Sequence, residues 1–179
     1  VFADTAGGAG TSGNVSLGID GDVLALGDQG IGILAQSRGA GGQGDISLEL
    51  ADGNLVYFGS DGEGVHISGG ADNLFLNHGE LVGKDWMRGW AVRAEEGNDL
   101  VENTGSLFGQ VDLGMGANRF VNAEEGLLAP GYRFLLGDPR NLLINDGTMM
   151  PGYMGAAQHT RMTGSFTQSS TGKTFAELD

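Results

Sequence analysis

A short phrase recurs along the second half of this chain and constrains its architecture. In each copy an Asn is followed, after one to three residues, by Gly and then by a large apolar residue two places further on. The copies start at Asn77, Asn103, Asn122 and Asn145. Their glycines, at positions 79, 105, 126 and 147, are 26, 21 and 21 residues apart. A period in the low twenties is typical of one structural unit stacked on copies of itself.

The composition indicates that the stacked unit is made of strands. Gly supplies 35 of the 179 residues, and each Gly inside a helix costs about 1 kcal/mol relative to Ala. Between the glycines lie short alternating apolar runs such as Val15-Leu17-Ile19 and Ile46-Leu48-Leu50, which have the period of two that a half-buried strand requires. We therefore predict an all-β solenoid.

The repeat also predicts which side chains point inward. The apolar residue two places before each Asn lies on the same side of its strand as that Asn. We therefore expect a buried ladder in which each Asn amide bonds the Asn of the next coil. The Gly that follows permits a corner, and the core resumes beyond it at Leu81, Leu107, Leu128 and Met149. The preceding segments, including Asp72-Asn73 and Gly97-Asn98-Asp99, have residues typical of turns.

The charge balance excludes several classes of function. Nine basic residues against 23 acidic ones give a net charge of −14, which disfavours nucleic acids and anionic membrane surfaces. No apolar run approaches the roughly 18 residues of a membrane-spanning helix, and the first residues are no signal peptide. Cysteine is absent, which rules out disulfides, thiol catalysis and zinc–thiolate sites.

One segment stands out as a candidate partner-binding site, namely Lys84 to Trp90, which holds both tryptophans of the chain. Trp86, Arg88 and Trp90 could stack a sugar or anchor a protein partner. The alternative is a wide loop whose rings pack on neighbouring coils, with Arg88 covering a ring face. Aromatic residues fill cores more often than they bind ligands, so this alternative is favoured.

No catalytic, cofactor or metal site is predicted, and the chain is not expected to be an enzyme. Acids cluster at Asp45-Glu49-Asp52, Asp61-Glu63, Glu95-Glu96-Asp99 and Glu124-Glu125. Carbohydrate-active β-helix enzymes use such carboxylates, but solvated turn acids are the favoured interpretation. The three histidines, His66, His78 and His159, share no metal-ligand spacing.

The C-terminal stretch resembles the end of the passenger domain of Gram-negative autotransporters (type V secretion). Asn145-Asp146-Gly147-Thr148 through Pro151-Gly152 is followed by Gly164-Ser165-Phe166-Thr167-Gln168 and then by Gly172 to Glu177-Leu178-Asp179. The segment Gly30 to Ser37, followed by Gly-rich sequence, is similar to a repeat of α-proteobacterial passengers, as is Asn103 to Asn118.

This resemblance implies a right-handed parallel β-helix with coils over 1–130. Residues 131–179 would be continuous with these coils and form a C-terminal cap that nucleates folding, called the autochaperone. It implies export through the outer membrane and display on the bacterial surface, or secretion. The expected role is that of a β-helical stalk and folding nucleus that contributes to adhesion or self-association and to virulence. Its partner would be a host-cell surface, extracellular matrix or the same protein on neighbouring cells. The precursor would carry a C-terminal membrane barrel. The alternatives are a released ligand for a host-cell receptor and a carbohydrate-active enzyme on the same fold.

Overall fold

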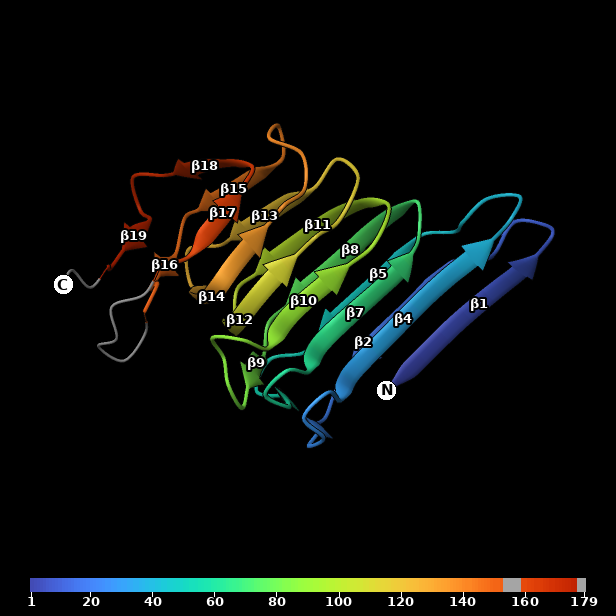
Figure 1. The fold of residues 1–179 in the computed structure, drawn as a ribbon, viewed down its shortest axis with the longest axis horizontal. Helices are drawn as coiled ribbons and strands as arrows, with labels where there is room; N and C mark the ends of the chain where they lie inside the picture. Colours follow the sequence, from blue (N-terminus) through green and yellow to red (C-terminus); the bar gives the residue numbers. More distant parts are fainter. Residues whose placement is uncertain (153–158, 177–179) are drawn as a thin grey trace.

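The computed structural model describes residues 1–152 and 159–176, which contain strands and turns without helix. Every strand pair is parallel, and the strands stack coil upon coil along one axis, from the N-terminal coil at one end to the C-terminal coil at the other (Figure 1). The predicted all-β class and stacked parallel architecture are confirmed. Each coil crosses three faces, which we call the long face, the ladder face and the short face.

The long face and the short face belong to one 12-stranded sheet. The long face contains β1 (Phe2–Gly8), β4 (Ile31–Gly39), β7 (Glu63–Gly69), β10 (Trp90–Ala94) and β17 (Arg161–Thr163). The short face contains β3 (Val23–Ala25), β6 (Leu55–Phe58), β9 (Glu80–Gly83), β16 (Thr148–Met149) and β19 (Lys173–Thr174). The strands β12 (Ser106–Asp112) and β14 (Leu127–Leu135) contribute to both faces.

The ladder face is a separate sheet of seven strands, one from each coil. Its strands are β2 (Val15–Ile19), β5 (Ile46–Leu50), β8 (Asp72–Asn77), β11 (Asn98–Asn103), β13 (Arg119–Asn122), β15 (Leu142–Asn145) and β18 (Ser165–Gln168).

The two strands that span both faces bend where the short face meets the long face. The first half of β12 pairs with β9 and its second half with β10. Its register with β14 shifts between Gly109 and Val111, which marks the corner. At Gly109 a Cβ would lie 2.9 Å from the backbone nitrogen of Ala91, so the bend relies on a residue without a side chain. The expected boundary between the coils and the C-terminal cap, at residue 131, lies inside β14. The stack therefore continues through this part of the chain.

The core is a column of apolar side chains from all three faces. The residues predicted to point inward on the ladder face, Phe75, Val101, Phe120 and Leu143, are at most 1% exposed. On the short face Leu81, Leu107 and Leu128 are fully buried, whereas Met149 is only partly buried against the core. The predicted core positions are thus confirmed, with Met149 the least enclosed.

The Asn ladder is present and runs from β8 to β18. The Nδ2 atom of Asn77 donates to Oδ1 of Asn103 (2.6 Å), Asn103 to Asn122 (2.8 Å) and Asn122 to Asn145 (2.8 Å). The last amide, Asn145, reaches Oε1 of Gln168 at 3.5 Å. Each amide also donates to a backbone carbonyl beyond its own coil, as Asn103 does to Leu127 (3.2 Å). All four Asn side chains are fully buried. These bonds give each amide nitrogen the partner that burial requires, while Oδ1 of Asn77, at the first rung, has none among the described residues.

The glycines of the repeat are needed for close stacking of the corners. None of the four, which are all among the described residues, has a positive φ. A Cβ at Gly105 would lie 2.0 Å from the carbonyl oxygen of Gly79, and one at Gly147 would lie 2.2 Å from that of Ala123. The corner therefore tolerates only Gly because successive backbones touch there.

A second polar ladder, which sequence analysis did not predict, lies at the other end of the ladder face. Asn73, Asp99, Asn118 and Asn141 are at most 6% exposed. Asn73 donates to Oδ1 of Asp99 (2.8 Å), and the backbone nitrogen of Asp99 donates to Oδ1 of Asn118 (3.0 Å). Asn73 and Asp99 were interpreted as turn residues, but they lie within β8 and β11.

Replacing Asn103 by Ala should destabilise the whole stack. The change removes the acceptor of Asn77 and the donor to Asn122, leaving buried polar atoms unpaired, and each such loss costs about 1–3 kcal/mol. We expect the free energy of unfolding to fall by about 2–4 kcal/mol in urea denaturation. Asn54→Ala is the control, because its amide bonds only its own turn. Equal losses in the two variants would contradict a stabilising ladder.

Asp99 should make stability depend on pH. Burial raises its pKa to about 7, against an opposing hydrogen bond from Asn73. Since the folded pKa exceeds that of the unfolded chain, this residue lowers stability progressively as the pH rises from about 4 to about 7. Asp99→Asn should therefore stabilise the protein at pH 8, by at most about 4 kcal/mol, and have little effect at pH 4.

Urea denaturation at both pH values measures this difference. Asp61→Asn, at an exposed position, controls for the loss of one surface charge. An equal effect of Asp99→Asn at pH 4 and pH 8 would show that this carboxyl does not change ionisation on folding.

Candidate functional site

The segment with both tryptophans forms a turn that projects between the short face and the long face. We call residues 84–89 the Trp loop; it joins β9 to β10, and Trp90 is the first residue of β10. Asp85 organises the loop, since its carbonyl accepts from the backbone nitrogens of Arg88 (3.0 Å) and Gly89 (2.8 Å). Its carboxylate accepts from the backbone nitrogen of Met87 at 3.2 Å. The loop is therefore a hydrogen-bonded turn of defined shape.

The Trp loop is also fixed to later coils. The carbonyl of Met87 accepts from the backbone nitrogen of Tyr132 in β14 (3.0 Å), and the side chain of Gln110 in β12 donates to the carbonyl of Arg88. At Gly131 a Cβ would lie 2.6 Å from the Met87 carbonyl oxygen. Close docking of the loop thus depends on a glycine more than 40 residues further along the chain.

The two tryptophans are half-buried, and Arg88 is exposed. Arg88 was expected to cover a ring face, but over Trp90 this position belongs to another arginine. The guanidinium that lies over the Trp90 ring is that of Arg93, 5.9 Å from the ring centroid, while Arg88 approaches Asp85 at 3.8 Å. Arg93 and Trp90 share strand β10 and both point outward, whereas Arg88 is held in the turn. Arg93 therefore extends this candidate surface from the loop onto the long face.

Arg93 belongs to a charged network that sequence analysis did not identify. Its Nη1 donates to Oε1 of Glu63 (2.7 Å), and the other oxygen of Glu63 bonds Nδ1 of His66. His66 Nε2 lies 3.5 Å from Oε1 of Glu95, which also accepts from Ser68 through Oε2 (2.6 Å). Arg38 donates to Ser68 (2.6 Å). The network joins β4, β7 and β10, so it cross-links three successive coils.

The ionisation of this network follows from its contacts. The hydrogen bond with Glu63 raises the pKa of His66, against the opposing effect of burial. Burial alone would raise the pKa of Glu63, but His66 and Arg93 outweigh it and lower that pKa. The hydrogen bond from Ser68 lowers the pKa of Glu95. Each acid is thus stabilised as a carboxylate by a neighbour, and the network holds Arg93 in place over Trp90.

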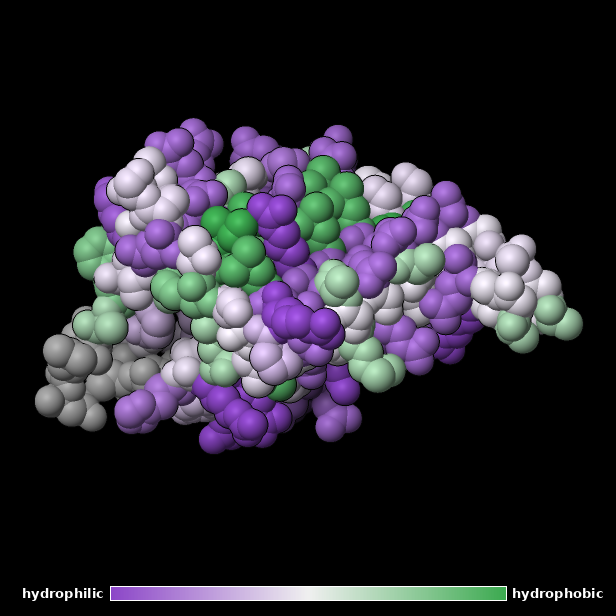
Figure 2. Space-filling view, turned by 90° about the horizontal axis from the view of Figure 1, so that it is seen from above, coloured by the Kyte–Doolittle hydropathy of each residue, from purple (hydrophilic) through white to green (hydrophobic). Residues whose placement is uncertain are grey.

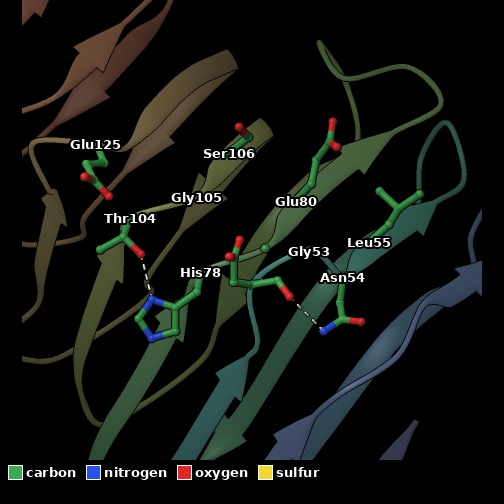
Figure 3. A pocket seen from close by; sticks show the side chains of 11 residues that line it. Gly53, Asn54, Leu55, His78, Glu80, Thr104, Gly105, Ser106 and Glu125 are labelled. Carbon is green, nitrogen blue, oxygen red and sulfur yellow. Dashed lines mark hydrogen bonds between the residues drawn. The ribbon is translucent and has the colours of Figure 1, made fainter.

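A shallow groove of about 330 Å³ runs along the corner between the ladder face and the short face (Figure 3). Asp52, Glu80 and Glu125 lie along it, on exposed positions of different coils. Between them Nδ1 of His78 bonds Oγ1 of Thr104 at 2.6 Å, as Figure 3 shows. The groove therefore gathers Asp52 and Glu125 from the predicted acid clusters and adds Glu80. An acidic, polar groove of this kind suits a neutral or cationic ligand.

The other acids of the predicted clusters do not meet in one place. Glu63 and Glu95 belong to the network on the long face, and Asp99 is buried in the second ladder. His159 is exposed. Within the described ranges, no group of three or more His, Cys, Asp or Glu side chains could hold a metal ion. The same residues contain no helix long and apolar enough to cross a bilayer.

No protein-family model, curated protein or solved structure matches this chain.

His66 should titrate above its ordinary pKa of 6.5, because Glu63 stabilises the imidazolium form. We expect Glu63→Gln to lower the midpoint, since burial and the charge of Arg93 then oppose protonation with only Glu95 left to favour it. An NMR titration of the imidazole resonances measures both midpoints. His78, which lies on another corner, is the internal control. A midpoint unchanged by Glu63→Gln would contradict the proposed coupling.

Proposed function

We propose that this chain is part of a surface-displayed passenger protein of the Gram-negative autotransporter class, exported through the outer membrane. In this proposal a right-handed parallel β-helix forms a stalk, and the Trp loop contributes to adhesion or self-association. The partners would be a host-cell surface, extracellular matrix or copies of the protein on neighbouring cells. In the precursor the stalk would lead to a C-terminal membrane barrel.

The observation that carries this proposal is the continuous hydrogen-bonded stack. The ladder from Asn77 to Gln168 links five successive coils, and the corner glycines bring their backbones into contact. Stacked units of this kind form stiff, elongated bodies in which each coil contacts only its neighbours. Such a body suits the role of holding a contact site away from a membrane.

A role of residues 131–179 as folding nucleus is supported by packing at the start of this segment. The rings of Phe120 and Phe134 meet edge to face, with centroids 5.1 Å apart and planes at 72°. The ladder continues from Asn145 onto Gln168 and onto the carbonyl of Lys173 (3.1 Å). These contacts give the last coils a ready template on which preceding coils could add during export.

The adhesive role of the Trp loop is supported by its residue types and its fixed shape. Trp, Tyr and Arg dominate the energetics of protein interfaces, and Trp86, Trp90, Tyr132 and Arg93 occur around one docked loop. A loop that is ordered before binding loses less conformational entropy on contact. The exposed fraction of Tyr132, 43%, leaves part of its ring open to a partner.

The test uses beads coated with the folded chain, scored for attachment to host cells and for bead–bead clustering. We expect saturable attachment that heat-unfolded protein does not show. Trp86→Ala with Trp90→Ala should weaken it at least about tenfold, since truncating a Trp that is an interface hot spot costs about 2 kcal/mol or more. Leu24→Ala with Leu26→Ala, two exposed apolar residues remote in sequence, is the control.

The outcomes separate the candidate roles. Undiminished attachment of the folded double Trp variant would contradict the Trp loop as contact site. Attachment to host cells without any clustering would favour the released receptor ligand. Absence of both would leave only the stalk and folding roles.

A further inference from the structure

The outer side of the ladder face carries an apolar patch that the functions above do not use. Residues that alternate with the buried ladder positions point outward on β8, β11, β13 and β15, and their register places them in two rows. The first row contains Leu74, Leu100, Arg119 and Leu142, and the second contains Leu76, Glu102, Val121 and Ile144. The six aliphatic side chains are half-buried and Arg119 is exposed, so this side faces solvent.

Such a patch is unusual on a chain with a net charge of −14. Contiguous apolar areas on soluble proteins commonly mark interaction surfaces. In the view of Figure 2 the surface is largely hydrophilic, but its middle part has hydrophobic areas separated and bordered by hydrophilic side chains. A half-buried sheet face of this type packs well against another sheet, at a distance of about 10 Å.

The two charges inside the patch indicate what covers it. Glu102 and Arg119 lie on neighbouring strands and in different rows, since Glu102 pairs with Val121 and Arg119 with Leu100. Neither forms an ion pair with another described residue. Two facing copies are related by a two-fold axis that lies between the sheets and parallel to them. An axis perpendicular to the line from Glu102 to Arg119 brings the acid of one copy opposite the base of the other. The patch is thus complementary to itself, as a two-fold symmetric interface requires.

We propose that two copies of this chain associate through their ladder faces, with the aliphatic side chains in contact and Glu102 of each copy paired with Arg119 of its partner copy. The rows extend over only four strands, roughly 15 Å, so the apolar contact is smaller than in a stable dimer. We therefore expect micromolar association. Its biological role rests on the proposed surface display, where many copies on one membrane raise the effective concentration. The dimer itself does not depend on that display.

Sedimentation equilibrium of the 179-residue chain in 0.15 M salt tests the proposal. We expect a reversible dimer. Glu102→Arg and Arg119→Glu should each weaken association at least tenfold, because each places like charges together across the interface. The double variant with both changes should regain the native dissociation constant within about threefold. Leu100→Gln, which adds no charge, should also weaken association.

Glu49→Arg is the matched control, because Glu49 lies on β5, one strand beyond Leu76 and outside the patch. It should leave the dissociation constant unchanged. Circular dichroism and thermal unfolding identify any variant that fails to fold. A monomer at all concentrations, a dimer insensitive to Glu102→Arg, or equal weakening by Glu49→Arg would each overturn the proposal. Since these measurements involve no cells, they stand apart from the outcome of the bead experiment.

Discussion

A carboxamide buried in an apolar core must find its hydrogen-bond partners there, and the rest of this structure depends on that requirement. Asn103 satisfies it by bonding Asn77 on one side and Asn122 on the other. This arrangement is possible only when successive coils lie in register at the spacing of a parallel sheet. A slip of one residue would turn every ladder Asn outward and bring its neighbours into the core. The ladder therefore selects one register among those that apolar packing alone would allow.

The register fixed by the ladder determines where the outer side chains meet. On the long face it places Glu63, His66 and Arg93 beside one another from strands that are about 30 residues apart in sequence. It also places Gly131 of β14 against the carbonyl of Met87, so that the Trp loop packs on β14. The same register aligns the aliphatic rows on the ladder face. Each surface considered for function is thus a consequence of the stacking order in the core.

The core could be predicted from sequence because the repeat is explicit. Asn and Gly recur at similar spacings, so the inward positions of Phe75 and Phe120 followed from alternation along each strand. The wide loop that holds Trp86 was also predictable, whereas Trp90 lies in β10. The docking of that loop could not be predicted, because it involves β12 and β14 through a backbone carbonyl and a glycine. Asn73 and Asp99 were assigned to turns because their residue types favour turns, and only the stacked partner on the next coil shows that they are buried. The contact between Arg93 and Trp90 could not be predicted without the strand register.

The corner glycines limit how the length of the stack can change. Each corner rests directly on the one before it, and the amides of Asn103 and Asn122 each bond an Asn in the coil on either side. An insertion or deletion of part of a coil would leave a corner glycine without the backbone that it packs against. It would also leave an amide without its hydrogen-bond partner. Only whole coils, which span 19 residues from Asn103 to Asn122 and 32 from Phe2 to Leu34, can be added or removed without breaking this order. The length of the stack is therefore quantised, and it can change only in steps of one strand spacing, about 4.8 Å.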